Sequence, residues 1–263
     1  MHRSGHAKAM KIQILGCSGG VGPRLRTTSI LIDDDILIDA GTGVSALSLE
    51  RMSRIEQVFV THSHLDHVCG LAFMADNLVG AIDHSIVIRG STSTIKALRD
   101  HVFNWTIWPD FSELPNPRQA VIQFKEYSGR PISIGHQRRL RAFEVEHTVP
   151  GVGYAVEGPN GVFAYSGDTL DCASLWRGLN RLPRLDYLMI EIAFPDAQAE
   201  LGQISGHFTP KVLGSAIQQL KHRPKLLLTH FKPGCERRIR QQARQALAGW
   251  DMHFLKSGDC FSL

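Results

Sequence analysis

The chain has 263 residues, of which 43% are hydrophobic and 21% are charged, and its formal net charge is +4. This composition is typical of a soluble globular protein, and the lack of any run of 18 apolar residues excludes a membrane-spanning helix. The length is enough for one sizeable core, so we expect a single domain over residues 1–263.

Basic residues are spread along the chain, with the densest groups at Arg138-Arg139-x-Arg141 and Arg237-Arg238-x-Arg240. Such groups more often form a solvated face than a nucleic-acid-binding surface, so we expect no nucleic-acid partner. The first ten residues lack the apolar segment of an export signal, and the five cysteines follow no pattern. We therefore expect reduced thiols in a cytoplasmic protein.

The first half of the chain predicts strands that alternate with turns and helices. In chain order we expect a strand at 11–15, a glycine-rich turn at 16–23, a hairpin at 29–39, a strand at 58–60, a helix at about 70–81, a strand at 86–88, a helix at 92–101 and an irregular aromatic segment at 103–118. Asp33–Asp35 suits the turn of the hairpin, and Ser91 or Ser93 should cap the second helix.

The second half predicts another sheet. We expect its strands near 121–127, 132–134, 139–146, 152–157 and 162–166. Strands at 185–192 and 225–229 and helices at 210–220 and 237–247 should follow.

Side chains that bind metals are concentrated in Thr61–His67, directly after the predicted strand 58–60. Within six residues this run holds His62, His64, Asp66 and His67. Imidazole and carboxylate ligands suit Zn²⁺, Mn²⁺ or Fe better than a thiolate-preferring metal. Four such groups are too many for one tetrahedral ion with an open position. The run therefore predicts two divalent ions side by side, with zinc as the first choice.

The glycine-rich turn offers a competing motif, because Gly16-Cys17-Ser18-Gly19-Gly20 fits the G-x-S-x-G pattern of a serine nucleophile. That motif needs a helix directly after the serine. Gly22-Pro23 does not permit the helix, so we do not predict a serine hydrolase. Without a helix N-terminus the turn is also a weak phosphate-binding loop.

The spacing His62-x-His64-x-Asp66-His67 resembles the signature of the metallo-β-lactamase superfamily. The resemblance implies an α/β (α+β) fold, a four-layer αββα sandwich with two mixed sheets between helices. It also implies further ligands, and candidates appear in the expected order at His147, after an alternating stretch, and at Asp168 and His230, after apolar strands. Asp39 matches an early structural aspartate of that superfamily.

The resemblance also implies how the ligands divide. One ion would be held by His62, His64, His147 and Asp168, and the other by Asp66, His67, Asp168 and His230. Asp168 would bridge two ions about 3.5–4 Å apart. Asp39 would orient a ligand imidazole through its other ring nitrogen.

Two downstream segments, around Glu191 and around Ser205-Gly206-His207, resemble parts of the tRNase Z branch of this superfamily. In that branch a Glu–His pair protonates the leaving oxygen, which suits a phosphodiester because an alkoxide leaves poorly. The resemblance thus implies Glu191, His207 and Asp66 as catalytic residues. The alternative for His207 is a helix-start residue bonded to backbone.

The longer pattern His62 to Leu71 resembles class II 3′,5′-cyclic-nucleotide phosphodiesterases, as does the aromatic segment from Phe103 to Pro109. Residues 72–76 depart from that class. Ser18 and three aromatic residues are candidate substrate contacts, namely Phe103, Trp105 and Trp108. Such aromatic residues either stack on a purine or simply pack the loop.

From these patterns we expect a metal-dependent phosphodiesterase that hydrolyses cyclic AMP or cyclic GMP to the 5′-nucleotide with a metal-bridged hydroxide. We expect this small substrate as the partner and no association with a membrane. Whether the protein forms a homodimer is left open. The alternatives are a tRNase Z-like enzyme acting on RNA 3′ ends, a hydrolase of lactones, esters or β-lactams, and a non-catalytic protein that keeps the fold.

Overall fold

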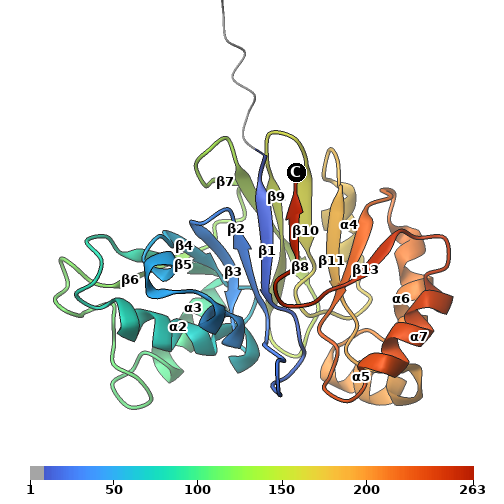
Figure 1. Ribbon diagram of the computed structural model, residues 1–263, viewed down its shortest axis with the longest axis horizontal. Coiled ribbons are helices and arrows are strands. Elements are labelled where there is room, and N and C mark those ends of the chain that lie inside the picture. Colours follow the sequence, from blue (N-terminus) through green and yellow to red (C-terminus); the bar gives the residue numbers. More distant parts are fainter. Residues whose placement is uncertain (1–8) are drawn as a thin grey trace, which may run out of the picture.

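The computed structural model of the protein describes residues 9–263, in which two seven-stranded sheets stand face to face (Figure 1). The expectation about an export signal rests mainly on residues 1–8, which lie outside this range. No helix within residues 9–263 has both the length and the apolar character needed to cross a membrane.

The first sheet has the strand order β14-β1-β2-β3-β4-β5-β6. Its strands are β1 (Lys11–Gly16), β2 (Ser29–Ile32), β3 (Ile36–Ala40), β4 (Gln57–Phe59), β5 (Ile86–Gly90), β6 (Ile122–Glu126) and β14 (Cys260–Ser262). β3 to β6 are parallel to one another, whereas β1 pairs antiparallel with both neighbours.

The second sheet has the order β13-β12-β11-β10-β9-β8-β7. Its strands are β7 (Ile132–Ser133), β8 (Arg139–Val145), β9 (Gly151–Glu157), β10 (Val162–Tyr165), β11 (Tyr187–Glu191), β12 (Lys225–Thr229) and β13 (Met252–Phe254). β10 to β13 are parallel, and β9 is antiparallel to both β8 and β10.

Helices cover the outer face of each sheet (Figure 1). With the first sheet lie η1 (Thr42–Ala46), α1 (Leu49–Met52), α2 (Leu65–Leu78) and α3 (Thr92–His101). With the second lie α4 (Ala173–Asn180), η2 (Asp196–Gln198), α5 (Ala199–Ser205), α6 (Pro210–Ala216), η3 (Ile217–Gln219) and α7 (Glu236–Ala246). Ser91 caps α3 as predicted, since its hydroxyl accepts from the Thr94 amide at 3.1 Å.

Three apolar cores separate these layers. Along β2 and β3, Ile30 and Ile38 face the second sheet, whereas Leu31 and Leu37 face the helices. This alternation follows from the two-residue period of a strand and gives each sheet two buried faces. A third core lies between the second sheet and α4, α6 and α7. The predicted four-layer αββα sandwich is therefore confirmed.

Several elements differ from the prediction. The strand expected near 121–127 lies in the first sheet as β6, parallel to β5, and not in the second. Sheet membership depends on long-range pairing that a local pattern does not contain. The helix expected to begin near residue 70 begins at Leu65, and Asp66 stands in its first turn, where a carboxylate complements the helix dipole. The short elements α1, α4, α5, β13 and β14 were not predicted.

Arg138 was expected on a solvated face but is buried at 1% exposure. Its guanidinium bridges the sheets by pairing with the hairpin residues Asp33, at 2.7 Å, and Asp35. A buried arginine must have such partners, because an unpaired charge inside a protein is costly. The acidic turn of the hairpin thus serves to fix one sheet against the other.

Candidate metal centre

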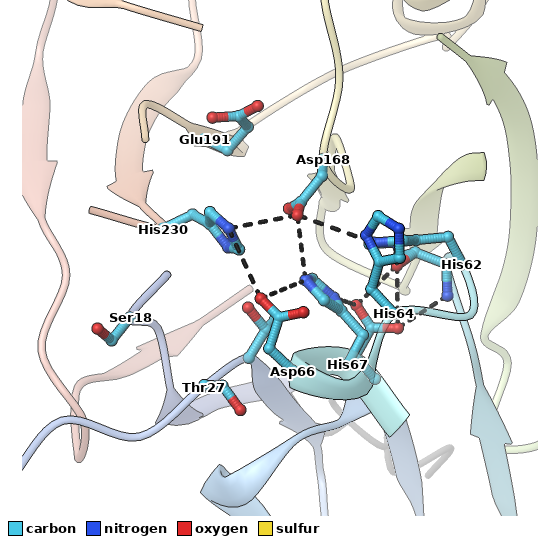
Figure 2. A network of polar contacts seen from close by, with 12 residues as sticks. Ser18, Thr27, His62, His64, Asp66, His67, Asp168, Glu191 and His230 are labelled. Carbon is cyan, nitrogen blue, oxygen red and sulfur yellow. Dashed lines mark hydrogen bonds and ion pairs between the residues drawn. The ribbon is translucent and has the colours of Figure 1, made fainter. Parts of the chain in front are cut away.

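The polar residues singled out in the sequence stand at the carboxyl ends of strands. Asp39 ends β3, Glu191 ends β11 and His230 directly follows β12, while His147 and Asp168 come shortly after β8 and β10. Because β3 and β4 are parallel, as are β10 to β12, these ends meet at one edge of each sheet. Figure 2 shows imidazoles and carboxylates from both sheets pointing toward one another there.

Three imidazoles converge on one side of this cluster. His64 Nδ1 lies 3.2 Å from His62 Nε2 and 3.2 Å from His147 Nε2. Two nitrogens bound at about 2.0–2.1 Å to one tetrahedral ion lie roughly 3.3 Å apart. The nitrogen positions therefore have the spacing of a shared cation. The Nδ1 of His147 bonds the carbonyl of Gly206 at 2.8 Å, which leaves Nε2 to face the cluster.

A second group surrounds the carboxylate of Asp168. Its Oδ2 lies 3.2 Å from His67 Nε2, 3.3 Å from His230 Nε2 and 3.8 Å from His62 Nε2. Asp66 Oδ2 approaches the same nitrogens of His67 and His230, at 3.7 and 3.8 Å. Asp168 thus stands between the two groups, as Figure 2 shows.

Buried atoms in this cluster lack the partners that a folded protein normally provides. Within residues 9–263, His67 Nε2 and Asp168 Oδ1 are buried and form no hydrogen bond. Unsatisfied polar atoms are costly, so such a pair indicates a missing ligand. Nitrogen and oxygen donors at these distances fit one cation near His62, His64 and His147 and another near Asp66, His67, Asp168 and His230.

The electrostatics also suit cations. Burial lowers the pKa of four imidazoles, namely His62, His64, His147 (to about 4) and His230. Neutral imidazole is the form that binds a metal. Burial works against ionisation of Asp168, yet His230 and His67 outweigh it and hold the pKa of this carboxyl well below its usual range. His67 differs, because Asp168 and Asp39 outweigh its burial and raise its pKa well above the usual value. The cluster therefore favours four neutral imidazoles and an ionised carboxylate.

Asp39 supports this cluster through its contact with His67. Its Oδ2 lies 2.6 Å from His67 Nδ1, and it accepts hydrogen bonds from the amide and the hydroxyl of Thr61. Asp39 is fully buried, so these partners are what compensate its charge. Carboxylates that bond the far nitrogen of an imidazole fix the orientation of the ring. Asp39 therefore directs His67 Nε2 toward the cluster.

Two of these residues have strained backbones. Asp39 and His230 have φ angles of 56° and 66°, a left-handed conformation that is unusual for residues other than glycine. Such strain persists where the surroundings impose it, often at functional sites. At His230 the glycine-rich loop imposes this conformation. The His230 amide donates to the Cys17 carbonyl at 2.9 Å, and the Gly19 amide donates to the Phe231 carbonyl at 3.0 Å.

Glu191 and His207 form a buried pair beside the cluster. His207 Nδ1 lies 3.0 Å from Glu191 Oε1, which also accepts from the amides of Phe208 and Thr169. Burial opposes a charge on His207, but Glu191 outweighs it and raises the pKa of the imidazole. One possible metal-binding atom of His207 lies within 4.8 Å of such atoms of His147 and Asp168. His207 therefore faces the cluster with a carboxylate behind it.

Gly206, between α5 and His207, was not singled out in the sequence. Its φ angle is 76°, and a Cβ built on it would lie 2.6 Å from His147 Nδ1. Both facts favour glycine, which tolerates the left-handed conformation and leaves room for the ring. The signal was present as Ser-Gly-His after a helix, but nothing local indicates the approach of His147.

We expect Gly206→Ala to displace His147 and to weaken metal binding by about 10–100-fold, the usual cost of disturbing a residue that orients a ligand. Gly234→Ala is the matched control, since Gly234 also has a positive φ of 84° but no atom lies within 4 Å of its added Cβ. Both variants should lose about 1–2 kcal/mol of stability from left-handed strain. Metal titration and denaturant unfolding separate the two effects; equal metal affinity in both variants would contradict this reasoning.

The aromatic segment divides between core and surface. Phe103 is 1% exposed and packs against the Phe124 ring, so the packing alternative holds for this residue. Trp108 donates from Nε1 to the Ala72 carbonyl at 3.0 Å and contacts the Phe73 ring, both on α2. Trp105 is 59% exposed. Only the two tryptophans therefore remain available to a ligand.

The structure places Ser18 behind the cluster. Its hydroxyl donates to the Phe231 carbonyl at 3.5 Å and points away from the imidazoles and carboxylates (Figure 2). In this arrangement the Ser18 hydroxyl does not face the cluster. Its segment instead pairs with the chain that carries His230, as the Ser18–Phe231 bridge shows.

Lys232 was missed in the sequence analysis and lies at the edge of the cluster. Its Nζ is 3.5 Å from His230 Nε2 and stands over the Phe194 ring at 5.9 Å. No carboxylate within residues 9–263 forms an ion pair with it. A lysine two residues after a ligand histidine was the available signal, but a single lysine gives no indication of its direction.

Comparisons with known proteins agree with this geometry. Residues 34–231 match a family model described as a β-lactamase superfamily domain. A probable 3′,5′-cyclic-nucleotide phosphodiesterase of Yersinia pestis is 27% identical in an alignment that covers 86% of this chain and 79% of that protein. A ribonuclease Z of Methanopyrus kandleri is 28% identical over 58% of this chain, a match that spans 52% of that protein.

Solved structures show the same fold. The unliganded yeast PDE1 has a TM-score of 0.80 at 17% identity, over 95% of this chain and 98% of that one. The metallo-β-lactamase fold protein YhfI from Bacillus subtilis has a TM-score of 0.77 at 19% identity, over 97% and 99%. Identities this low establish the shared architecture alone.

Proposed function

The chain belongs to the β-lactamase superfamily, and we propose that within it the protein is a metal-dependent phosphodiesterase that opens cyclic AMP or cyclic GMP to the 5′-nucleotide. The phosphodiesterase relatives support this proposal. The observation that carries it is the Glu191–His207 pair, which faces the same centre as His147 and Asp168. A lactone or alkyl ester also expels an alkoxide, so the choice of a phosphodiester over these substrates rests on the phosphodiesterase relatives.

The proposed ligand sets follow the two groups described above. One ion would be held by His62, His64, His147 and Asp168, and the other by Asp66, His67, Asp168 and His230. Zinc suits these nitrogen and oxygen donors, with manganese and iron as alternatives. When bound, two such ions neutralise phosphate charge and lower the pKa of water at the site.

We propose that His207 protonates the leaving 3′ oxygen. Glu191 occupies Nδ1 and stabilises the imidazolium, so the other ring nitrogen is the one that can donate. An alkoxide leaves poorly without a proton, so this donation lowers the barrier of the step that breaks the P–O bond. Glu191 raises the pKa of His207 in spite of its burial, which favours the protonated form that donates.

Lys232 is proposed to contact a phosphate oxygen, and the exposed Trp105 to offer a stacking surface for the base. Lys232 stands beside His230 and has no carboxylate partner within residues 9–263, so its ammonium is free to bind an anion. Its position between Phe194 and His230 places that charge at the edge of the centre. A cation there favours an anionic substrate over a neutral one.

We expect Lys232→Gln to raise KM for bis(p-nitrophenyl) phosphate about tenfold or more, the loss that follows removal of a hydrogen bond to a charged group. The change should be much smaller for a neutral lactone or carboxylic ester, and Lys232→Arg should recover part of the loss. Lys211→Gln, on the exposed side of α6, is the control. Equal effects on anionic and neutral substrates would show that Lys232 does not bind the phosphate of the substrate.

The ribonuclease Z relatives favour a second candidate, cleavage at an RNA 3′ end. That reaction breaks the same kind of bond and uses the same ligand set and proton donor, so the centre alone does not separate the two. The deciding test gives metal-reconstituted protein cyclic AMP, cyclic GMP, a tRNA precursor and a lactone. The proposal predicts 5′-AMP or 5′-GMP as product. Turnover of the precursor or the lactone alone would reject it.

A further inference from the structure

A cavity lies behind the glycine-rich loop, away from the metal centre. Its volume is about 240 Å³, and its walls include Ser18, Phe231 and Arg240. The Ser18 hydroxyl points away from the cluster in Figure 2, whereas the neighbouring His230 points into it. Phe231 and His230 therefore face different sites, and the mechanism proposed above makes no use of this cavity.

The charged side chains in the lining of this cavity are mostly basic. Four cationic residues contribute to it, Arg24, Arg26, Arg240 and Lys256, against a single carboxylate, Glu236. Within residues 9–263 none of the four forms an ion pair with a carboxylate. The nearby Asp259 is engaged by His253 at 2.7 Å. An excess of unpaired cations around one small cavity attracts an anion.

Arg240 is the most constrained of these side chains. Its guanidinium carbon stands 5.6 Å from the centre of the Phe231 ring and 5.4 Å from that of Phe254. Its Nε is buried and has no hydrogen-bond partner within residues 9–263. Stacking on aromatic rings fixes the plane of a guanidinium, and an unsatisfied buried donor indicates an acceptor that the chain itself does not supply.

The walls around Arg240 are held by backbone hydrogen bonds. The Arg26 carbonyl accepts from the amides of Cys17 and Ser18, at 3.0 and 2.9 Å, and a turn joins Gly22 to Leu25. Arg24 has a φ angle of 63°, so its place in this turn is conformationally defined. A cavity bounded in this way is formed before a ligand arrives, which reduces the ordering cost of binding.

We infer that this cavity is a second anion site, which binds a small molecule through a phosphate group. Guanidinium groups match the geometry of phosphate and can bind it with two parallel hydrogen bonds. The volume is below the 300–1,000 Å³ typical of sites for larger ligands, so the cavity suits a phosphate group with little attached to it. This phosphate is either inorganic or the phosphate group of a mononucleotide whose base and sugar lie outside the cavity.

Calorimetric titration of the metal-free, EDTA-treated chain tests this site without involving catalysis. The probes are inorganic phosphate and 5′-AMP, with chloride of equal ionic strength as the blank. We expect saturable binding of at least one probe, weakened about 10–100-fold in Arg240→Gln by loss of a charge-assisted hydrogen bond. Tighter binding of 5′-AMP would identify a nucleotide site, and tighter binding of inorganic phosphate a free-phosphate site.

Matched variants separate the cavity from the metal centre. Lys232→Gln reports on phosphate held near His230: loss of probe binding in this variant, with Arg240→Gln unaffected, would place the probe at the metal centre and overturn the inference. Arg177→Gln changes an exposed arginine on α4 that does not line this cavity, so it should bind the probe as the unmodified chain does. Arg240→Lys, which keeps the charge but not the planar fork, should lie in between, and melting curves confirm that each variant is folded. Absence of saturable binding, or equal binding by folded Arg240→Gln, would overturn the inference.

Discussion

Asp168→Ala is expected to remove hydrolysis of both cyclic AMP and bis(p-nitrophenyl) phosphate. Asp168 approaches His67, His230 and His62 with one oxygen and is 2% exposed, so no other carboxylate or water can easily take its place. The loss should exceed about 10³-fold, the upper figure for removing a single electrostatic stabiliser of a transition state. A good leaving group should not rescue the variant, because the residue supports the ions and not the proton donor.

Metal analysis of Asp168→Ala and of Asp168→Asn gives the reason for the loss of activity. Asp168→Asn keeps the size of the side chain but removes the charge that would hold two cations together, so both variants should bind less metal. Asp251→Ala, which removes a surface carboxylate that is 70% exposed, should retain both metal and activity. Substantial turnover by Asp168→Ala at saturating metal would contradict the proposed role of this residue.

His207→Ala is expected to slow hydrolysis of cyclic AMP by about 10²–10⁴-fold, the usual contribution of a general acid. The loss on bis(p-nitrophenyl) phosphate should be far smaller, since its phenolate leaves readily without a proton. Glu191→Gln should show the same dependence on the leaving group more weakly, because it leaves His207 in place but less basic. The measurement is kcat/KM on both substrates at saturating metal.

The metal content of His207→Ala decides between two roles. His207 also lies within ligand distance of His147 and Asp168, so the geometry allows it to hold an ion. Unchanged metal content with a selective loss on cyclic AMP supports proton donation. Equal losses on both substrates together with lower metal content would instead assign His207 to metal binding.

His147, Asp168 and His230 were identified through the resemblance to the superfamily, and their places in the chain agree with it. His147 follows an alternating strand, Asp168 and His230 follow apolar strands, and the ends of parallel strands meet at one edge of a sheet. Asp39 likewise stands at the end of β3. What local patterns lack is the pairing between distant strands, which is why β6 was placed in the wrong sheet.

Residues that act through long-range contacts escaped prediction. Gly206 is needed because His147, 59 residues away in the chain, bonds its carbonyl and leaves no room for a side chain. Lys232 and Arg240 resemble ordinary surface cations until the fold brings rings and imidazoles beside them. Conversely, Phe103 matched an aromatic motif but is buried in the core, because sequence alone does not give the direction of a loop side chain.

The central claim, that two divalent ions at this centre together support phosphodiester hydrolysis, is tested most directly by metal titration. Metal-free protein is titrated with Zn²⁺ while bound metal per chain and the hydrolysis of bis(p-nitrophenyl) phosphate are followed in the same samples. The account predicts that activity rises to a plateau at two ions per chain. Full activity at one ion per chain, or two bound ions without hydrolysis, would contradict it.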